Sequence, residues 1–380
     1  AWVTWIMDDW PEVLKRRDPE QFSRLDTDLR KLLSCGDGAL AISAKMADAF
    51  KKRYACEFAV AANGVSANHW SEPISASNGP IIVRYSGNLA PNMAAPSISA
   101  LARAVTRLSE DYDIRLEINT NKRWLESLDW TDVDRAIVSL SCDSFSDEAY
   151  RHWLQRADFS VIAYGATEEA VRYTQYSRAN KLPEVLASGA PVIGLGPSNI
   201  GTLEELAATE QAIVVHDVSA DAIIAALKPF LDSAEKRVDL AKSARRYAFA
   251  EMNIASERRR FHTALSLAAE RLPKPRAYDR GAFRDALRNS IVKLPEGANR
   301  RDIGAYQEIE RKLRPSPSAQ PLHEANRATE RNPGGSSHDA ASPPEFDEPR
   351  ARAARPVVVR FYSGKRALAF SIRRVIGIPR

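Results

Sequence analysis

Short apolar runs alternate along most of the chain with longer segments in which apolar residues recur at helical spacing. The short runs predict strands and the longer segments predict helices. Strands are predicted within the first residues and at 38–43, 58–66, 81–85, 114–118, 135–140, 159–163, 192–195 and 212–215. Helices are predicted at 18–33, 44–54, 97–109, 147–156, 203–208, 220–231, 234–250 and 256–272. Another helix is predicted near 124. A further helix is predicted to end at 189, and a loop is predicted between the strand 159–163 and this helix. This alternation predicts an α/β protein with a doubly wound parallel sheet.

Breaks in the pattern divide the chain into five parts. Residues 1–66 resemble the end of one α/β domain, and 67–80, rich in Ser, Asn and Pro, are typical of a linker. Residues 81–272 carry the longer alternation and close with two long helices. The composition of 273–355 predicts a largely disordered tail, and 356–380 regain hydrophobicity. Because the chain opens on a strand with no preceding partner, we expect an upstream part of the first domain to be missing.

The formal net charge of +5 conceals an asymmetry. Residues 271–380 contain 23 Lys and Arg against 12 Asp and Glu, whereas the remaining 270 residues contain 31 against 37. The mildly acidic predicted globular part disfavours a nucleic-acid-binding core. Three cysteines without paired spacing indicate free thiols in a reducing, cytoplasmic setting. The six histidines lack metal-ligand spacing, and the sequence shows neither a signal peptide nor an apolar run long enough to span a membrane.

Candidate ligand-binding residues follow the strands of the longer alternation. In a doubly wound sheet, ligands bind beyond the carboxyl ends of the strands, where helix N-termini expose unpaired N–H groups. Gly87 directly follows a strand, where a glycine lets the backbone approach a phosphate closely, although it is also a common turn residue. Ser139 and Ser141, after another strand, could line a base pocket.

The stretch 176–199, YSRANKLPEVLASGAPVIGLGPSN, combines a cation and an anion at the start of a short helix. Ser177, Asn180 and Lys181 lie at the mouth of this helix, and Glu184 lies one turn inside it. A carboxylate can accept hydrogen bonds from both hydroxyls of a ribose, while an ammonium faces a diphosphate. The alternative is an exposed i,i+3 ion pair without a binding role.

Four segments in order resemble the glycosyltransferases of GT-B fold, the group 1 or family 4-like enzymes: WIMDDWP, AISAKMADAFKKRYACEFAVAANGVS, IIVRYSGNLAPNMAAPSISALARAV and SRANKLPEVLASGAPVIGLGP. The resemblance covers about 2–272. It implies a Rossmann-like donor domain in which Lys181, Leu182 and Glu184 belong to the nucleotide-sugar signature, with Glu184 on the ribose. It also implies that Gly87 and Asn88 approach the phosphates. The last helix, 256–272, is expected to cross back to the acceptor-side domain.

The chain departs from this family in two places. Tyr176 stands where many members carry a first glutamate that contacts the donor sugar. No Lys or Arg occurs in 89–96, so Lys181, Arg178 or Lys122 is expected to neutralise the diphosphate.

Most of the acceptor-side domain, which usually carries a catalytic residue, is expected to be missing. Asp8 and Asp9 are the remaining candidates on that side. We take Asp9, with Lys181, as catalytic, the alternative being a turn that caps a helix ahead of Pro11.

These observations predict a metal-independent glycosyltransferase that needs no cofactor beyond its nucleotide-diphosphate-sugar donor. The acceptor is expected to be a saccharide or a lipid-linked molecule, as in polysaccharide biosynthesis. A non-catalytic module that binds nucleotide sugars or glycans, favoured by Tyr176, and a nucleotide-sugar epimerase of the same fold are the alternatives.

The segment 364–378, GKRALAFSIRRVIGI, predicts a basic amphipathic helix that contacts an anionic membrane from its cytoplasmic face. A disordered basic end, or a strand of a further domain, is the alternative.

Overall fold

The computed structural model describes residues 2–9, 11–12, 15, 18–71, 79–91, 93–270, 357–363 and 366–372. The chain divides into two compact units, Ala1–Lys274 with Ala354–Arg380, and Pro275–Ala353. All described residues belong to the first unit. The predicted tail 273–355 and half of the predicted linker 67–80, namely 72–78, lie outside the described residues.

The larger sheet has six parallel strands in the order β6-β5-β4-β7-β8-β9. Their bounds are β4 Ile81–Ser86, β5 Ile114–Asn119, β6 Val138–Ser141, β7 Phe159–Ala163, β8 Val192–Leu195 and β9 Ile213–Val215. Numbered along the chain within this sheet, the order is 3-2-1-4-5-6, which is the doubly wound Rossmann topology. The strand order reverses between β4 and β7, so a ligand crevice is expected at the carboxyl ends of these two strands.

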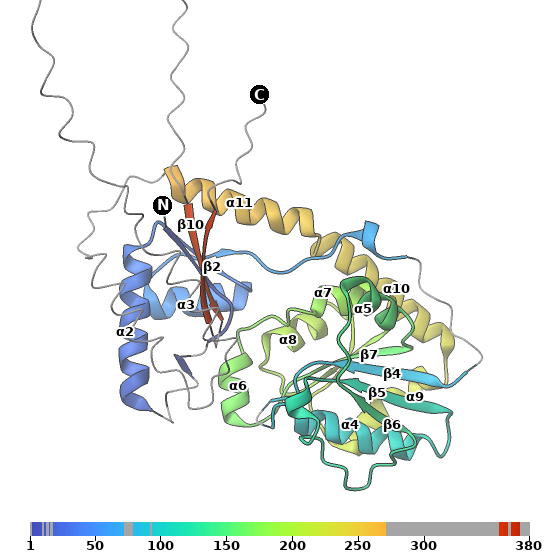
Figure 1. Cartoon of the computed structure of the whole chain (residues 1–380). Helices are drawn as coiled ribbons and strands as arrows, with labels where there is room; N and C mark the ends of the chain where they lie inside the picture. The colour runs from blue at the N-terminus through green and yellow to red at the C-terminus, as the bar shows by residue number, and fades with distance from the viewer. Residues whose placement is uncertain are drawn as a thin grey trace, which may run out of the picture. The chain divides into compact units, whose positions relative to one another are not determined.

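Helices cover both faces of this sheet (Figure 1). On one face, α4 (Ala95–Leu108) and α9 (Ala220–Leu231) pack on apolar side chains of β4, β5, β7 and β8. On the other, α5 (Asp147–Gln155), α7 (Leu182–Ala187), α8 (Gly201–Ala208) and α10 (Ala234–Glu251) form a second apolar cluster. Helix α7 is followed by Gly189, whose φ of +87° favours glycine. The predicted α/β fold with a doubly wound sheet is confirmed.

Two predictions in this region were wrong. The segment after β7, predicted as a loop, contains α6 (Glu168–Thr174), capped by Thr167, whose side chain accepts from the Ala170 N–H. The helix predicted near 124 is only the 3₁₀ turn η2 (Lys122–Trp124). In both places a short element carries too few residues to show a helical period in the sequence.

The smaller sheet has five strands in the order β11-β10-β1-β2-β3, with α2 (Pro19–Cys35) and α3 (Ala44–Tyr54) in the same region of the chain. The strands are β1 Trp2–Ile6, β2 Gly38–Ala41, β3 Ala59–Val60, β10 Val357–Ser363 and β11 Arg366–Ile372. Ser43 caps α3 by accepting from the Met46 N–H. The strand predicted at 58–66 is much shorter in the structure. Only Ala59–Val60 pair with β2, and Val65 forms an isolated bridge.

The prediction of a helix over 364–378 was also wrong for 366–372, the part of this segment that the structure describes. Strand β11 pairs antiparallel with β10, and β10 pairs parallel with β1. The β-branched run Val357–Val359 favours extended backbone, and β11 runs antiparallel beside it.

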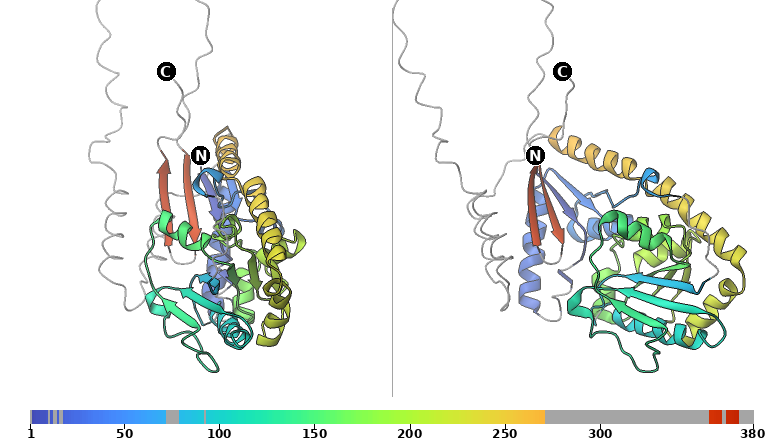
Figure 2. Two further views of the ribbon diagram at one scale, coloured as in Figure 1. Left: turned by 90° about the vertical axis from the view of Figure 1, so that its right-hand side faces the viewer. Right: turned by 45° about the vertical axis from the view of Figure 1, so that its right-hand side comes forward.

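A long C-terminal helix, α11 (Ile254–Glu270), packs on β1, β2 and β3 after α10 has packed on α7 and α9 (Figures 1 and 2). The short segment that joins α10 to α11 contains Asn253, which forms a parallel β-bridge with Val65. The buried carboxylate of Glu257 accepts from the Ala62 N–H at 3.0 Å. Helix α11 thus connects the two sheets, as the resemblance implied.

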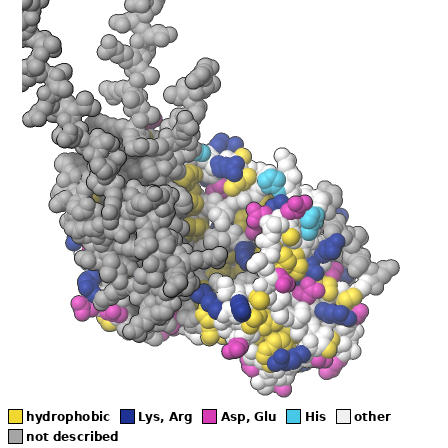
Figure 3. All heavy atoms as spheres, viewed as in Figure 1, with side chains coloured by type: hydrophobic (Ala, Val, Ile, Leu, Met, Phe, Trp, Pro, Cys, Tyr) yellow, Lys and Arg dark blue, Asp and Glu magenta, His cyan; other side chains and the backbone are white. Residues whose placement is uncertain are grey.

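Basic and acidic side chains are interspersed on the face shown in Figure 3, among the residues that the structure describes. No large patch of one sign is visible there.

Candidate functional site

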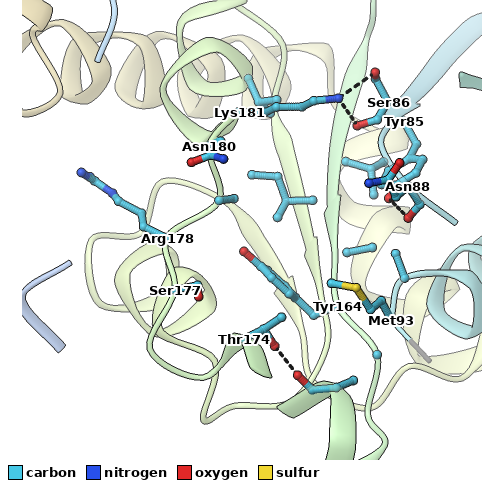
Figure 4. Close-up of a pocket in the computed structure, with 18 of the residues that line it drawn as sticks. Tyr85, Ser86, Asn88, Met93, Tyr164, Thr174, Ser177, Arg178, Asn180 and Lys181 are labelled. Carbon is cyan, nitrogen blue, oxygen red and sulfur yellow. Dashed lines mark hydrogen bonds between the residues drawn. The ribbon is translucent and has the colours of Figure 1, made fainter. Parts of the chain in front are cut away.

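A pocket of about 310 Å³ lies at the expected crevice (Figure 4). Its lining comes from the ends of β4 and β7, from α5 and α6, and from the segments that follow β1 and precede α4 and α7. Its principal polar lining residues are Asp8, Arg84, Ser86, Asn88, Tyr150, Tyr164, Tyr173, Thr174, Ser177, Arg178, Asn180 and Lys181. The sequence-predicted residues that the structure brings into this pocket are Asp8, Asn88, Ser177, Arg178, Asn180 and Lys181.

Lys181 extends across the pocket from the segment that precedes α7. Its Nζ donates to the backbone oxygen and to Oγ of Ser86, both at 3.0 Å, and lies 5.5 Å from the ring centroid of Tyr150. Burial lowers the pKa of Lys181, and the negative charge of Glu184 opposes this shift. The amine of Lys181 is thus placed at the end of β4, beside Ser86.

Glu184 lies in the first turn of α7, half-buried beside Lys181 and outside the pocket lining. Burial raises the pKa of its carboxyl, Lys181 lowers it, and Asp147 raises it further. The charge of Glu184 also contributes to the raised pKa of Tyr150, a pocket residue. Glu184 is thus at the rim of the pocket, on the side of α5, and its ribose-binding role stays a prediction.

The structure gives Gly87 a reason to be glycine that the sequence could not show. A Cβ at this position would lie 2.5 Å from the hydroxyl oxygen of Tyr85. The Gly87 N–H already donates to the Asn119 carbonyl at 3.0 Å. Asn88, the next residue, is exposed and lines the pocket, and its carbonyl accepts from the Tyr85 hydroxyl at 3.2 Å. Packing of Tyr85 therefore explains Gly87 without a ligand.

Ser141 lies along the same edge of the sheet but not in the pocket. In the strand register it aligns with Asn119, which aligns with Ser86. Its Oγ donates to Oδ1 of Asn119 at 3.3 Å. The three polar residues form a row along the carboxyl edge, and Ser86 is the one of the three that the pocket reaches.

Leu182 and Arg178 both interact with other residues of the protein. Leu182 is fully buried in the apolar cluster, and its N–H donates to the Ala179 carbonyl. The side chain of Arg178 points away from the other labelled side chains in Figure 4 and donates to Oε1 of Glu205 at 2.5 Å. Lys122 is exposed on η2 and does not line the pocket. Of the three cations proposed for a diphosphate, the structure therefore favours Lys181.

The structure brings Asp8, and not Asp9, into this pocket. Oδ1 of Asp8 accepts from Oγ of Ser177 at 3.1 Å; Tyr173 also hydrogen-bonds to Asp8, whose carboxyl pKa is raised by burial. Asp9 is fully buried and is held by Nη1 of Arg53 at 3.1 and 3.3 Å. Burial raises the pKa of Asp9 to about 6, although Arg53 opposes this. Asp9 lies instead in a second cavity.

Sequence reasoning missed Arg84 and the tyrosines of the pocket. Arg84 donates to Oε2 of Glu117 at 2.7 Å and lies 5.0 Å from the ring of Trp153. An arginine within an otherwise apolar predicted strand was the available signal, because a buried charge needs partners. The tyrosines Tyr85, Tyr150, Tyr164 and Tyr173 come from separate elements, and only the fold brings them together.

Among the residues that the structure describes, no group of three or more His, Cys, Asp or Glu side chains could hold a metal ion. None of the helices in that part of the chain has the length and apolar composition needed to cross a membrane. The three cysteines are free thiols, as predicted.

No family model matches the sequence, and no curated protein matches it. Solved structures do match. One is sucrose-phosphate synthase from Thermosynechococcus elongatus, with a TM-score of 0.54 and 17% identity over 69% of this chain and 66% of that one. A second is HepE from Anabaena in complex with UDP and glucose, with a TM-score of 0.52 and 13% identity over 69% of this chain and 71% of that one. A third is TarM from S. aureus in complex with UDP and other ligands, with a TM-score of 0.50 and 12% identity over 66% and 48%.

The chain spans less than two thirds of the length of sucrose-phosphate synthase and about half that of TarM. At such identities the likeness concerns the fold. The protein therefore has the GT-B fold. Its larger, doubly wound sheet corresponds to a Rossmann-like domain of that fold.

Proposed function

We propose that this protein transfers a sugar from a nucleotide-diphosphate sugar to a saccharide or lipid-linked acceptor, without a metal. The observation that carries the proposal is the pocket at the switch point of the larger sheet, which contains both the half-buried amine of Lys181 and the carboxyl of Asp8. HepE and TarM, which share this fold, were solved with UDP.

Lys181 would stabilise the leaving diphosphate. Its Nζ donates to both oxygens of Ser86, so a phosphate oxygen would replace the Ser86 oxygens as its acceptor. A buried cation stabilises developing negative charge more strongly than an exposed one because little water screens it. In the reaction the bond from the sugar C1 to the phosphate oxygen breaks, and a bond from C1 to the acceptor oxygen forms.

Asp8 is our candidate for the group that takes the proton of the acceptor hydroxyl. Its raised pKa suits a general base better than the pKa of an exposed carboxylate does. Ser177 and Tyr173 hydrogen-bond to Asp8 and would hold its orientation. This assigns to Asp8 the role that sequence reasoning gave to Asp9.

The test is incubation of the chain with a panel of nucleotide sugars, followed by product analysis. Transfer or slow hydrolysis of a donor supports the proposal. An epimerised donor identifies an epimerase, and binding without turnover identifies a non-catalytic module. The absence of any nucleotide-sugar binding refutes the transferase and the epimerase and leaves only a module that binds glycans. Tyr176, which favoured the module, is not among the pocket residues, so its presence does not by itself remove a contact from this pocket.

We also propose that the reaction belongs to polysaccharide biosynthesis in the cytoplasm, which the free cysteines support.

Contact with an anionic membrane through 364–378 now rests on sequence charge alone, since 366–372 form a strand. Each basic residue near such a surface contributes about 1 kcal/mol. We expect co-sedimentation with anionic vesicles to fall when 356–380 are removed and at high salt. Equal binding of the truncated and intact chains would contradict the contact.

A further inference from the structure

The segment that joins α6 to α7, residues 175–181, carries much of the polar lining of the pocket. Ser177, Asn180 and Lys181 line the pocket, whereas Tyr176 lines the second cavity together with residues of α3. This α6–α7 segment contains neither helix nor strand. Contacts with other parts of the protein must therefore fix its place, because a segment without regular structure makes few backbone hydrogen bonds of its own.

The hydroxyl of Thr202 makes three hydrogen bonds at this point. Thr202 lies in the first turn of α8 and is fully buried. Its Oγ1 accepts from the Tyr164 hydroxyl at 2.7 Å and from the Ala179 N–H at 3.0 Å, and it donates to the Ser177 carbonyl at 3.3 Å. A threonine hydroxyl has one proton to donate and two lone pairs with which to accept. Its hydrogen-bonding capacity is therefore fully used, and two of the three bonds hold the α6–α7 segment on either side of Arg178.

Tyr164 connects this hydroxyl to the pocket. It directly follows β7 and lines the pocket, and its hydroxyl end points toward the α6–α7 segment (Figure 4). Burial raises the pKa of Tyr164, the hydrogen bond with Thr202 opposes this shift, and the negative charge of Asp8 adds to it. Tyr164 is thus a neutral donor to Thr202 at any pH near neutrality.

The α6–α7 segment in turn carries two groups of the proposed reaction. Ser177, whose carbonyl accepts from Thr202, donates through Oγ to Oδ1 of Asp8 at 3.1 Å. Burial raises the pKa of Asp8, and this hydrogen bond from Ser177 lowers it. Lys181 follows four residues later and reaches Ser86. Thr202 is not among the pocket residues, so it can act on Asp8 and Lys181 only by holding this segment.

Two further contacts join α8 to the same segment. The Gly201 N–H donates to the Gln175 carbonyl at 2.9 Å, and Arg178 forms an ion pair with Glu205. The side chains of this ion pair are partly exposed, so water can replace either partner. Water does not reach the hydroxyl of Thr202. Its removal would leave two donors and one carbonyl without a partner in the interior, and the segment would have to move to satisfy them.

We propose that Thr202 is a positioning residue for the proposed transfer: its hydroxyl holds the α6–α7 segment so that Ser177 orients Asp8 and Lys181 reaches the end of β4. The roles of Asp8 and Lys181 in transfer rest on the proposed function. The positioning of Asp8 does not, and it can be measured without any ligand.

The experiment compares three variants of the full chain. Thr202→Val keeps the shape of the side chain and removes the hydroxyl, whereas Thr202→Ser keeps the hydroxyl and removes a buried methyl group. Thr209→Val is the matched control, because Thr209 lies at the other end of α8 and its hydroxyl donates to the Glu205 carbonyl at 2.7 Å, away from the pocket. Carbon NMR of chains labelled at the aspartate carboxyl carbons follows the titration of Asp8, whose signal is assigned with Asp8→Asn. Calorimetry measures the affinities for UDP and for uridine.

We expect the pKa of Asp8 to rise in Thr202→Val, because the buried carboxylate loses part of its hydrogen bond from Ser177. UDP binding should weaken by roughly two- to tenfold, and uridine binding by less than about twofold, because Lys181 faces the phosphates. Thr202→Ser and Thr209→Val should change neither the pKa of Asp8 nor the ratio of the two affinities. A loss of packing alone would affect Thr202→Ser at least as strongly as Thr202→Val, so this pattern is specific to the hydroxyl.

The outcomes separate this proposal from the proposed function. An Asp8 titration in folded Thr202→Val that coincides with that of the unmodified chain overturns the positioning of Asp8, and so does an equal shift in Thr202→Ser. Equal losses of UDP and uridine binding overturn the positioning of Lys181. A shift confined to Thr202→Val in a chain that does not bind UDP supports the positioning and refutes the transfer. If Thr202→Val does not fold, Thr202→Cys replaces it, since a thiol hydrogen-bonds only weakly, and the same rise in the pKa of Asp8 is required.

Discussion

Replacement of Gly64 by alanine should weaken the connection between the two sheets. Gly64 precedes Val65, which pairs with the segment between α10 and α11. A Cβ on Gly64 would lie 2.7 Å from the Met252 carbonyl oxygen, and 2.9 Å from both N and Cα of Ile254. All three are backbone atoms, so no side-chain rotation can relieve the overlap. The segment that contains Gly64 must therefore move away from the segment between α10 and α11.

The magnitude follows from the hydrogen bonds at this point. The Val65 N–H donates to the Met252 carbonyl at 2.8 Å, and the Ile254 N–H donates to the Val65 carbonyl at 2.9 Å. Each bond contributes about 0.5–1.5 kcal/mol net, so loss of both costs about 1–3 kcal/mol. The lower entropy of alanine in the unfolded chain offsets about 0.4–1 kcal/mol of this. We therefore expect Gly64→Ala to lower the free energy of unfolding by about 1–2 kcal/mol.

Urea denaturation of the full chain measures this change, and Gly36→Ala is the matched control. Gly36 follows α2 with a φ of −74°, and its added Cβ would meet nothing nearer than 3.4 Å. Alanine fits there without strain, so the control should be neutral or slightly stabilising. If Gly64→Ala is no less stable than Gly36→Ala, the close approach seen at the bridge does not constrain the folded protein.

Three further predictions concern ionisable residues. Glu184→Ala should weaken UDP binding by about 1–3 kcal/mol by removing a charge-assisted contact, and unchanged affinity by calorimetry in a folded variant would refute the ribose assignment. Lys181→Ala should weaken binding of UDP more than that of uridine, whereas equal losses would count against a phosphate role. Because burial raises the pKa of Asp9 to about 6, the folded state binds more protons than the unfolded state from about pH 4 to pH 6. The Asp9 contribution to the free energy of unfolding is therefore fully present below about pH 4 and falls by about 3 kcal/mol as the pH rises through 6. Asp9→Asn should lack this fall in urea titrations across that range, and parallel profiles would show that the pKa is not raised.

Much of the fold was predictable because its signals are local. The strands β4, β5, β7 and β8 are apolar runs, and helices of three turns or more, such as α9 (Ala220–Leu231), have a clear period. Their alternation is sufficient for a doubly wound parallel sheet, since parallel strands need crossover connections. Short elements such as α6 were missed because seven residues contain too little of a period to detect.

The pairing of the last strands was also beyond local reasoning. The segment 366–372 has apolar residues compatible with either a helix or a strand. Its antiparallel pairing with β10 is short-range, but the pairing of β10 with β1 joins residues more than 350 positions apart. No local propensity specifies such a contact.

In the site, the sequence by itself determined which residue types stand near the carboxyl ends of the strands, and among them Lys181 is in the pocket. Only the tertiary structure decided which way each side chain points. Adjacent residues such as Asp8 and Asp9 face different spaces, because successive side chains of extended backbone point to opposite sides. Whether Tyr176 faces the donor pocket or the second cavity depends likewise on which side of one helical segment meets α3. That packing is set by contacts between distant parts of the chain, so no reading of the neighbouring residues alone could assign it.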